Sequence, residues 1–346
     1  MTAAVRIAHL LPNMTIGGRE RMVASLCAHS KQMVLQQTLI CYEPPDPKAT
    51  QISCDAPVLQ LNRKSRTFGA ALRNALAPFD IVHAQGHISA YYLRKSGYTG
   101  ARLATMHVGM EDSWRWLLPI RRGLRAMDHL TAVCAPMAEL YHRISGRPVD
   151  MIANGIMLMD FAYHNARPAA SNEPFRFVML SRLHKVKRHA DAIAAIDCLA
   201  AAGQNVELVI AGEGPEAGYL RQCAATRPHV RLVGTVTDIA PFLAAHHALI
   251  LCSEHEGMPV ALVEAMAAGL PIVASNVGGI ASVASESALF ITPKRTDQLA
   301  MAMMRLVSEP TLWQMLSTQA SVQANLFDAA NVAQHYRALY DRLMMR

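Results

Sequence analysis

The sequence predicts an α/β protein with two domains, each built on a doubly wound parallel sheet. Short apolar runs alternate with helix-length segments along nearly the whole chain. Within these runs the hydrophobicity is continuous rather than alternating, which is typical of parallel strands covered by helices on both faces. The chain has 346 residues, enough for about two domains with separate hydrophobic cores.

In the first half, the runs expected to form strands are 5–11, 34–41, 81–84, 103–107, 130–133 and 149–152. In the second half they are 176–180, 206–211, 230–233, 248–252, 271–274 and 288–291. The segment 164–174 is polar and contains two prolines, which is typical of a linker. We therefore expect an N-terminal domain over 1–163 and a C-terminal domain over 175–329.

The composition excludes several classes of protein. Hydrophobic residues make up 52% and charged residues 17% of the chain, which is incompatible with a disordered, collagenous or coiled-coil protein. The seven cysteines are odd in number and form no close pairs, so we expect reduced thiols in a cytoplasmic protein rather than disulfides or a zinc finger. The sequence has neither a signal-peptide pattern nor an apolar stretch of about 18 residues.

The net charge is carried by one half of the chain. The whole chain has 33 basic and 26 acidic residues, a balance of +7. Residues 1–165 contain 18 basic and 11 acidic residues, which is also +7, so the remainder, with 15 of each, is neutral. This asymmetry predicts that the two halves bind different partners.

The segment 253–279 carries the clearest chemical signal. Gly257 permits a tight turn, Pro259 suits the start of a helix, and Gly269 suits its end. The amide groups at such a helix N-terminus can bind an anion. Glu256 lies on the preceding loop, and Glu264 lies one turn inside the helix, on the face of Val260. The segment therefore suits a ligand that carries both phosphate and hydroxyl groups.

The two carboxylates also have a plainer interpretation, as solvated residues of a loop and a helix surface. Against it, Glu264 is flanked by apolar residues on both sides, namely Leu262, Val263, Ala265 and Met266. Sugar and ribose hydroxyls are well matched by carboxylate acceptors. From the residues alone, the ligand-binding and the surface interpretations are about equally supported.

Glu256 is followed by seven residues and then by Glu264, and AMAAGLPIVAS and Gly278-Gly279 come next. This pattern resembles the E-x7-E signature of family 4 glycosyltransferases. Members of this family are retaining, metal-independent enzymes of GT-B fold, with two Rossmann-like domains facing across a cleft. The resemblance implies that Glu264 binds the nucleotide ribose and Glu256 lies beside the donor sugar. It also implies that the donor is lined by main chain of Gly257, Met258, Pro259 and Val260.

A cationic loop agrees with this family. The segment 177–189 (FVMLSRLHKVKRH) is similar to a strand followed by the family's G-R-L-x-x-x-K-G loop. The resemblance implies that Arg182 and Lys187 bind the donor diphosphate. Ser181 and Arg188 stand where the family has glycine, and neither change removes a charge.

Weaker resemblances extend to both halves. Gly212 and Gly214 match a G-x-G-P turn of the donor domain, and Gly234 matches a loop near the base. Gly17 and Gly18 match a G-G-x-E loop that faces the donor phosphates, and His107 matches a strand-end histidine that contacts the donor sugar. Without the family, each would be an ordinary turn or a structural histidine. His83 is interpreted as structural.

The resemblance implies transfer of a sugar from a nucleotide-sugar to an acceptor hydroxyl with retention of anomeric configuration. We expect a UDP-sugar, with a GDP-sugar as the alternative, and a glycan or lipid-linked acceptor of envelope polysaccharide or lipopolysaccharide synthesis. The N-terminal domain would bind the acceptor, the C-terminal domain the donor, and a helix near 330–346 would pack back on the first domain. No cofactor and no metal are expected, because no D-x-D motif is present.

Two other functions stay open at this stage. A sugar-nucleotide 2-epimerase has a similar pair of domains, and a non-catalytic partner of a glycan-assembly complex would have a damaged site. A dinucleotide oxidoreductase is disfavoured, because no G-x-G-x-x-G follows the first strand.

The segment 112–127 (DSWRWLLPIRRGLRAM) combines tryptophan and aliphatic residues with arginines. Arg63, Lys64 and Arg66 form a second basic cluster. This composition suits an interfacial segment on an anionic membrane surface, and equally suits a helix that packs its Trp face on the core. We expect a protein of the cytoplasm, peripheral on the membrane if the first interpretation holds. Nucleic acid is not expected as a partner.

Overall fold

The computed structural model describes residues 4–29, 35–45, 50–109, 116–162, 165–170 and 172–345. The chain forms two compact units, Met1–Gly155 with Ala329–Arg346 and Ile156–Asp328. Among the described residues, no helix is both long and apolar enough to cross a membrane.

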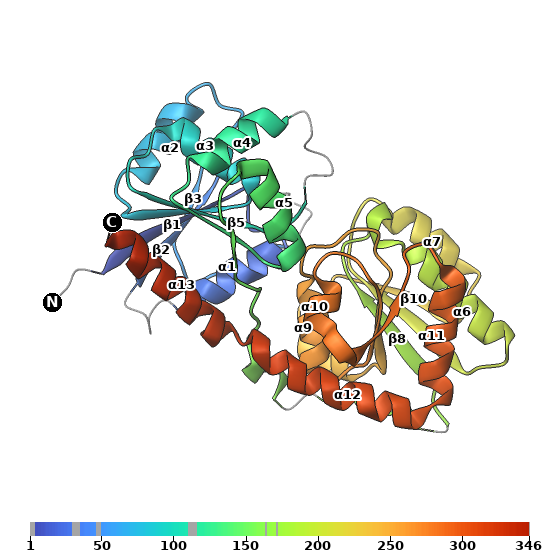
Figure 1. Ribbon diagram of the computed structural model, residues 1–346. Coiled ribbons are helices and arrows are strands. Elements are labelled where there is room, and N and C mark those ends of the chain that lie inside the picture. Colours follow the sequence, from blue (N-terminus) through green and yellow to red (C-terminus); the bar gives the residue numbers. More distant parts are fainter. Residues whose placement is uncertain are drawn as a thin grey trace. The chain divides into compact units, whose positions relative to one another are not determined.

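The first unit contains a parallel sheet in the order β3-β2-β1-β4-β5-β6-β7. Helices α2, α3, α4 and α5 cover one face of this sheet, and α1 and α13 cover the other (Figure 1). The strands are β1 Val5–Leu11, β2 Leu35–Cys41, β3 Val58–Gln60, β4 Ile81–Gln85, β5 Ala101–Met106, β6 His129–Ala132 and β7 Asp150–Met151. The helices are α1 Gly18–Ala28, α2 Phe68–Leu76, α3 His87–Ser96, α4 Leu117–Arg125, α5 Ala135–Ser145 and α13 Ala329–Met344.

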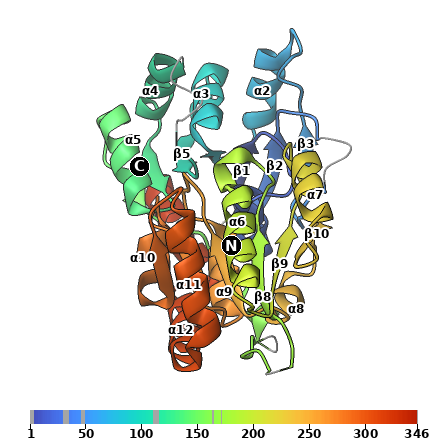
Figure 2. The ribbon, with the colours of Figure 1, turned by 90° about the vertical axis from the view of Figure 1, so that its right-hand side faces the viewer.

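The second unit contains a parallel sheet in the order β10-β9-β8-β11-β12-β13. Figures 1 and 2 show α6 and α11 on one face and α9 and α10 on the other. The strands are β8 Phe175–Leu180, β9 Val206–Ala211, β10 Val230–Gly234, β11 Ala248–Leu251, β12 Ile272–Ser275 and β13 Ala288–Ile291. The helices are α6 His189–Ala201, α7 Ala217–Ala225, α8 Ile239–Ala244, α9 Val260–Ala267, α10 Ile280–Ala284, α11 Thr296–Ser308 and α12 Pro310–Ala324.

Both sheets follow the strand order of doubly wound nucleotide-binding folds. In these folds the chain adds strands on one side of the first strand and then crosses over to add strands on its other side. The reversal is the position beside the first strand where this change of side occurs. Ligands of such folds bind outside the carboxyl ends of the strands at this reversal. In the second unit the reversal lies between β8 and β11. The loops that follow these two strands carry Arg182, Lys187 and Glu256, so the topology itself brings these residues to one edge of the sheet.

The predicted strands are present, and the structure adds β3. This strand has three residues, all of them exposed, so it lacks the continuous apolar run by which the other strands were predicted. The prediction for residue 34 lies outside the described residues.

The predicted linker at 164–174 does not separate the two units. The chain crosses between them near Gly155 and Ala329, and the described residues of 165–174 belong to the second unit, where the Ala166 N–H donates to the Ala268 carbonyl oxygen at 2.7 Å. Proline and polar residues mark exposed chain, which occurs within a unit as well as between units. The final helix α13 buries Val332, Ala333, Tyr336, Leu339, Tyr340 and Leu343 in the core of the first unit.

Candidate active site

The carboxyl ends of β8, β9 and β10 lie beside one another at the cationic loop of the second unit, the segment after β8 that carries Arg182 and Lys187. The Leu183 N–H donates to the Glu213 carbonyl oxygen at 2.9 Å, and the Gly212 N–H donates to the Gly234 carbonyl oxygen at 2.7 Å. Gly212 has φ +138°, and a Cβ there would lie 1.9 Å from the Ser181 carbonyl oxygen. The three glycines predicted from sequence, Gly212, Gly214 and Gly234, therefore lie beside the loop that carries Arg182, and close backbone approach explains the first of them.

The two predicted cations of this loop have different surroundings. The Arg182 side chain is exposed, and its guanidinium has no hydrogen-bond or ion-pair partner within the described part of the chain. The Lys187 ammonium donates to Glu256 Oε1 at 2.5 Å, and the two side chains are only 16% and 8% exposed. Ser253 Oγ donates to the same carboxylate oxygen at 2.7 Å. The structure thus joins Lys187 to Glu256, residues that the sequence assigned to separate parts of a donor.

Arg188 holds the cationic loop against the loop after β11. It has φ +56°, in the left-handed region that glycine adopts most readily. Its guanidinium donates to both carboxylate oxygens of Asp191 at 2.9 Å and to Glu254 Oε1 at 3.3 Å. Lys294 pairs with the other Glu254 oxygen at 3.2 Å. The glycine that the family motif has at this position indicates that the backbone adopts a left-handed conformation there. The ion pairs that hold Arg188 in this conformation were not predicted from the sequence.

The loop that carries Glu256 is fixed from its other side by a glycine pair. Gly278 has φ +56°, and a Cβ there would lie 1.9 Å from the Glu256 carbonyl oxygen. The Gly279 N–H donates to the Gly257 carbonyl oxygen at 2.8 Å. Helix α9 begins directly after this loop, with Pro259 in extended conformation as its N-cap. The glycines at the end of the signature therefore determine where Glu256 and the N-terminus of α9 lie.

The two signature carboxylates are both largely buried. Glu264 lies in the second turn of α9 and is 7% exposed, so the interpretation of Glu264 as a solvated surface residue is wrong. Met258 and Val260 are buried as well, at 5% and 6% exposure. A buried carboxylate requires polar partners, because desolvation of a charge is costly, and this favours a structural or ligand-binding task for Glu264.

In the first unit, the predicted glycine pair begins α1. Gly17 is the N-cap of the helix, and a Cβ there would lie 2.6 Å from Glu20 Oε2. Glu20 is 5% exposed and accepts from Arg19 Nε at 2.7 Å. Gly17 therefore leaves room for the Glu20 carboxylate, and Gly18 is the first residue of α1.

His107 follows directly after β5 and is buried, at 8% exposure. Its Nε2 lies 2.9 Å from Gln85 Oε1. Burial, with a smaller contribution from the Arg19 charge, lowers the pKa of His107 to about 3, so the imidazole is neutral at physiological pH. His83 is fully buried and bonds to Thr105 and Tyr340, which agrees with a structural role.

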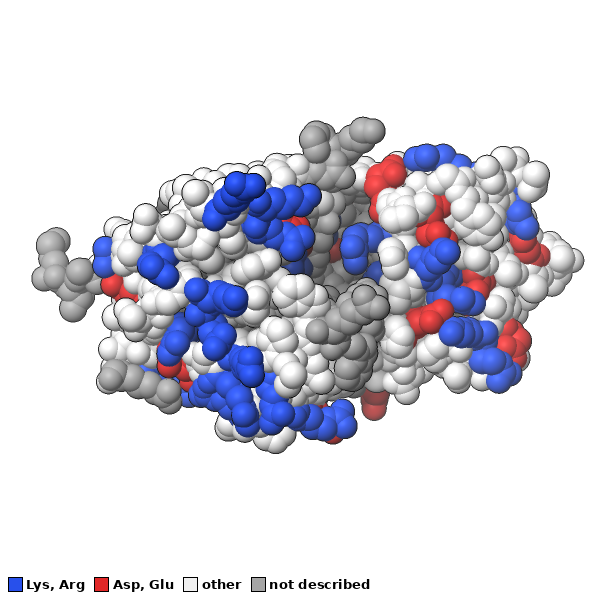
Figure 3. Space-filling model, turned by 90° about the horizontal axis from the view of Figure 1, so that it is seen from above, with Lys and Arg blue, Asp and Glu red and all other residues white. Residues whose placement is uncertain are grey.

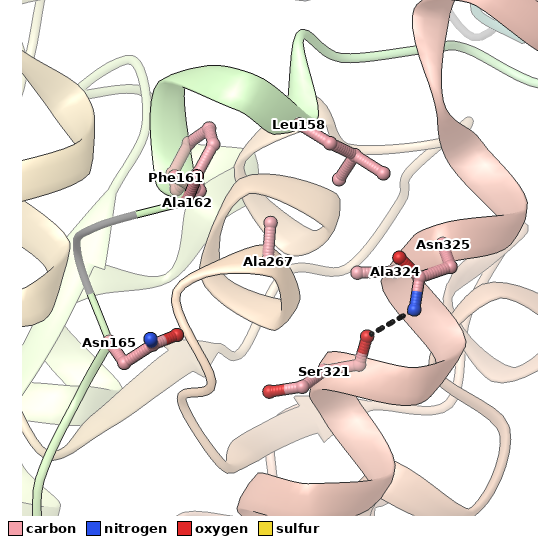
Figure 4. Close-up of a pocket in the computed structure, with 8 residues that line it drawn as sticks. All are labelled: Leu158, Phe161, Ala162, Asn165, Ala267, Ser321, Ala324 and Asn325. Carbon is pink, nitrogen blue, oxygen red and sulfur yellow. Dashed lines mark hydrogen bonds between the residues drawn. The ribbon is translucent and has the colours of Figure 1, made fainter.

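A separate cavity of about 160 Å³ lies in the second unit (Figure 4). Asn325 Nδ2 donates to the Ser321 carbonyl oxygen there at 3.2 Å. None of the lining residues is charged, and Ala267 places the cavity at the C-terminal end of α9, opposite the end that follows Glu256. It is lined by Leu158, Phe161, Ala162, Asn165, Ala267, Ser321, Ala324 and Asn325. This cavity is therefore distinct from the candidate site, and its lining offers no cation to bind a diphosphate.

Metal ligands are not grouped in the described part of the chain: no three His, Cys, Asp or Glu side chains there are placed to share an ion. Metal independence of the reaction stays a prediction.

Helix α4 lies within the segment 112–127 and buries only part of its apolar residues. Binding of this segment to a membrane stays a prediction. Ile120 and Leu124 are buried, while Trp116 and Leu118 are 47% and 64% exposed. Trp114 and Arg115 lie outside the described residues. Figure 3 shows Lys and Arg side chains gathered over the first unit's part of one face of the molecule. Exposed basic residues of that unit include Arg63, Lys64, Arg66, Arg94, Lys95, Arg121, Arg122 and Arg125.

Comparisons with known proteins cover both units. A family model described as Glycosyltransferase Family 4 matches residues 16–158, and one described as Glycosyl transferases group 1 matches residues 174–309. The putative glycosyltransferase EpsF of Bacillus subtilis is 29% identical over 78% of this chain and 79% of its own length. The lipopolysaccharide core biosynthesis glycosyltransferase LpsD of Rhizobium meliloti is 29% identical over 74% of this chain and 75% of its own.

Among solved structures, HepE of Anabaena in complex with UDP and glucose has a similar fold. The TM-score is 0.84 at 15% sequence identity, with 97% of this chain and 99% of that one covered. At this level of identity the likeness concerns the fold alone, which is GT-B.

Proposed function

Because this chain belongs to the family 4 glycosyltransferases of GT-B fold, we propose that it transfers a sugar from a nucleotide-sugar to an acceptor hydroxyl with retention of anomeric configuration. We favour a UDP-sugar as donor, with a GDP-sugar as the alternative. The observation that carries this proposal is the arrangement at the carboxyl edge of the second sheet. There the exposed Arg182, the Lys187–Glu256 pair and the start of α9 belong to loops that follow β8 and β11.

In the proposed donor complex, Arg182 and Lys187 bind the diphosphate. Arg182 has no competing partner among the described residues, so its guanidinium is free to bind an anion. Lys187 would exchange Glu256 for a phosphate oxygen, and the amide groups at the start of α9 would add partial positive charge. Glu264 would accept hydrogen bonds from the ribose hydroxyls.

For the transfer itself, we propose that the diphosphate leaves from the face of the sugar that the acceptor attacks. The bond from the anomeric carbon to the phosphate oxygen breaks, the bond to the acceptor oxygen forms, and the acceptor proton passes to the leaving phosphate oxygen. Arg182 and Lys187 would stabilise the charge that develops on the diphosphate, the role that a metal ion has in other transferases. Glu256 and His107 would orient the sugar.

For the acceptor, we propose a glycan or a lipid-linked molecule of envelope polysaccharide synthesis, which the relationship to LpsD supports. We further propose that the first unit binds an anionic membrane surface on the cytoplasmic side. The exposed Trp116 is the N-cap of α4, and the exposed Leu118, Arg121 and Arg122 lie on that helix; such side chains suit the headgroup region of a bilayer.

The donor proposal is tested by thermal shift and isothermal calorimetry with UDP-, GDP- and ADP-sugars. We expect one class to raise the melting temperature, and Arg182→Ala to abolish most of that rise. Arg231→Ala is the matched control, because Arg231 is an exposed arginine of the same unit that pairs with Glu207. If no nucleotide-sugar stabilises the protein, the proposal fails. If the sugar isomerises without any acceptor, the protein is an epimerase instead.

The membrane proposal is tested by sedimentation with liposomes that contain phosphatidylglycerol. We expect binding at low salt that is lost at high salt, because each basic residue near an anionic surface contributes about 1 kcal/mol and is screened by ions. Arg121→Glu with Arg122→Glu should reduce it. The control is Arg231→Glu with Arg305→Glu, an equal charge change on the second unit. Equal binding to neutral liposomes, or none to either kind, would contradict the proposal.

A further inference from the structure

A continuous chain of hydrogen bonds crosses the sheet of the first unit and ends at His107. Gln37 Nε2 lies 3.1 Å from the Leu26 carbonyl oxygen, and Gln37 Oε1 lies 2.5 Å from His9 Nε2. His9 Nδ1 lies 3.0 Å from Gln85 Nε2, and Gln85 Oε1 lies 2.9 Å from His107 Nε2. We refer to Gln37, His9, Gln85 and His107 as the polar chain.

The polar chain follows the order of the strands. Gln37 lies on β2, His9 on β1, Gln85 at the end of β4, and His107 directly after β5, and these strands are adjacent in the sheet in that order. All four side chains are buried, with exposures of 0–8%. Buried polar side chains in the centre of an apolar sheet are costly unless their hydrogen bonds are made, and here each member bonds to the next.

The Leu26 carbonyl oxygen, at the Gln37 end of the polar chain, determines which group donates and which accepts in every hydrogen bond of the polar chain. The Leu26 carbonyl oxygen can only accept, so the Gln37 amide nitrogen must face it, and Gln37 Oε1 must face His9. Because that oxygen accepts, His9 Nε2 carries a proton. Burial lowers the pKa of His9 to about 4, so the ring is neutral and its Nδ1 is an acceptor. Gln85 then donates through Nε2 to His9, and its oxygen accepts a proton from His107 Nε2.

This order determines which nitrogen of His107 is protonated. A neutral imidazole with a proton on Nε2 has a bare lone pair on Nδ1. His107 Nδ1 is buried and has no hydrogen-bond partner among the residues that the structure describes. A purely structural histidine would leave this acceptor unsatisfied at a cost in stability, whereas a ligand hydroxyl would satisfy it.

We propose that Gln85, His9 and Gln37 are positioning residues that hold His107 as the Nε2–H tautomer, so that its Nδ1 accepts a hydrogen bond from a hydroxyl of the donor sugar. This inference rests on the proposed function for the identity of the hydroxyl. The tautomer itself depends only on the polar chain. Gln37, the member farthest from His107 along the polar chain, therefore influences the donor sugar without touching it.

The sharpest perturbation of the polar chain is Gln37→Leu. Leucine is close to glutamine in volume, and the substitution removes the hydrogen bonds of Gln37 to His9 and to the Leu26 carbonyl oxygen. His9 Nε2 then has no acceptor, and the His9 proton is free to move to Nδ1. The Gln85 amide would turn over in response and offer an N–H to His107 Nε2, which must then lose its proton. We expect His107 to change from one tautomer to a mixture that includes the Nδ1–H form.

Thr131→Val is the matched control. Thr131 Oγ1 bonds to Thr105 Oγ1 at 2.6 Å and is fully buried on β6 of the same sheet, but Thr131 is not a member of the polar chain. The substitution removes the buried Thr131 hydroxyl, with its hydrogen bond to Thr105, at nearly constant volume. It should cost stability as Gln37→Leu does and leave the His107 tautomer unchanged.

The experiment is ¹⁵N NMR of protein labelled at histidine, with His107→Gln to assign the resonances. In the wild type we expect pyrrole-like Nε2 and pyridine-like Nδ1 shifts for His107 at neutral pH, and averaged shifts in Gln37→Leu. A wild-type Nδ1–H tautomer, or an unchanged single tautomer in Gln37→Leu, overturns the proposal. The wild-type spectrum decides even if the variant fails to fold.

Calorimetry separates this proposal from the proposed function. We expect Gln37→Leu to weaken UDP-glucose or GDP-mannose binding by about tenfold, the equivalent of one hydrogen bond, and to leave UDP or GDP binding unchanged. Equal loss for the nucleotide with and without its sugar contradicts a contact of His107 with the sugar. If neither nucleotide-sugar binds any variant or the wild type, the proposed function fails, while the NMR result still decides the role of the polar chain.

Discussion

Replacing Glu256 with Gln is expected to increase the affinity for a free nucleoside diphosphate. Glu256 accepts a hydrogen bond from the Lys187 ammonium at 2.5 Å, and both side chains are largely buried. A diphosphate that binds Lys187 must first break this bond, and it is also repelled by the carboxylate. The amide of Gln competes less strongly for the ammonium and carries no charge. Turnover should nevertheless fall, because the amide cannot orient the sugar as the carboxylate does.

The size of the gain follows from the bond that is weakened. A hydrogen bond that involves a charged group contributes about 1.5–3 kcal/mol. The Lys187–Glu256 bond has a charge on both groups and belongs at the upper end of this range, whereas a bond from the Lys187 ammonium to a Gln amide has a charge on one group and belongs at the lower end. The variant should therefore bind UDP or GDP more tightly by roughly 1 kcal/mol, which is about fivefold. Isothermal calorimetry on the wild type, Glu256→Gln, Lys187→Ala and the double variant measures this as a thermodynamic cycle.

Glu254→Gln is the control for the general effect of removing a carboxylate. Glu254 lies on the same loop but pairs with Arg188 and Lys294 instead of Lys187. We expect a smaller change in affinity in this variant. The reasoning is refuted if Glu256→Gln leaves the affinity unchanged or weakens it, or if the full gain persists when Lys187 is already Ala.

Three further predictions concern the donor loop, the glycine turn and the buried histidines. Arg182→Ala should weaken UDP or GDP binding by about 1.5–3 kcal/mol; calorimetric affinity equal to that of the wild type would remove Arg182 from the site. Gly214→Ala should lower the free energy of unfolding by about 1–3 kcal/mol, since Gly214 has φ +158° and its Cβ would lie 2.4 Å from the Leu183 carbonyl oxygen. Gly218→Ala, in α7 with open space around it, should instead raise stability by roughly 0.5–1 kcal/mol, and chemical denaturation distinguishes the two. Finally, stability should decrease as the pH falls from about 6.5 to 4, because His9 stays neutral in the fold, with its pKa lowered to about 4, while the unfolded chain takes up the proton. His9 alone accounts for roughly 3 kcal/mol, and a denaturation midpoint that does not change over this range would contradict the prediction.

Local patterns were sufficient to predict most of the fold. Continuous apolar runs locate strands because a strand of a covered parallel sheet is apolar on both faces. The same reasoning misses β3, whose Val58 and Leu59 are more than 40% exposed. It also misplaces the boundary between the units, since the composition of 164–174 shows exposure but does not show which core the segment packs against.

The candidate site was predictable motif by motif, but the contacts between motifs were not. Lys187 and Glu256 belong to different loops, 69 residues apart, and each was assigned to a different part of the donor. Their ion pair depends on the adjacency of β8 and β11, which neither motif contains. The Arg182 and Glu264 assignments stay predictions.

The polar chain shows where sequence reasoning could have gone further. His9, Gln37 and Gln85 are buried polar residues of the strands β1, β2 and β4, and a buried polar residue in a strand requires a partner. Their pairing could not be read from the sequence, because the partners lie on different strands and 22 to 76 residues apart. Once the strand order β2-β1-β4-β5 is known, the three polar positions and His107 fall into a row. A buried polar residue in a strand is therefore a signal that becomes specific only when the topology is known. In this protein that signal leads from a helix carbonyl to a histidine at the carboxyl edge of the sheet.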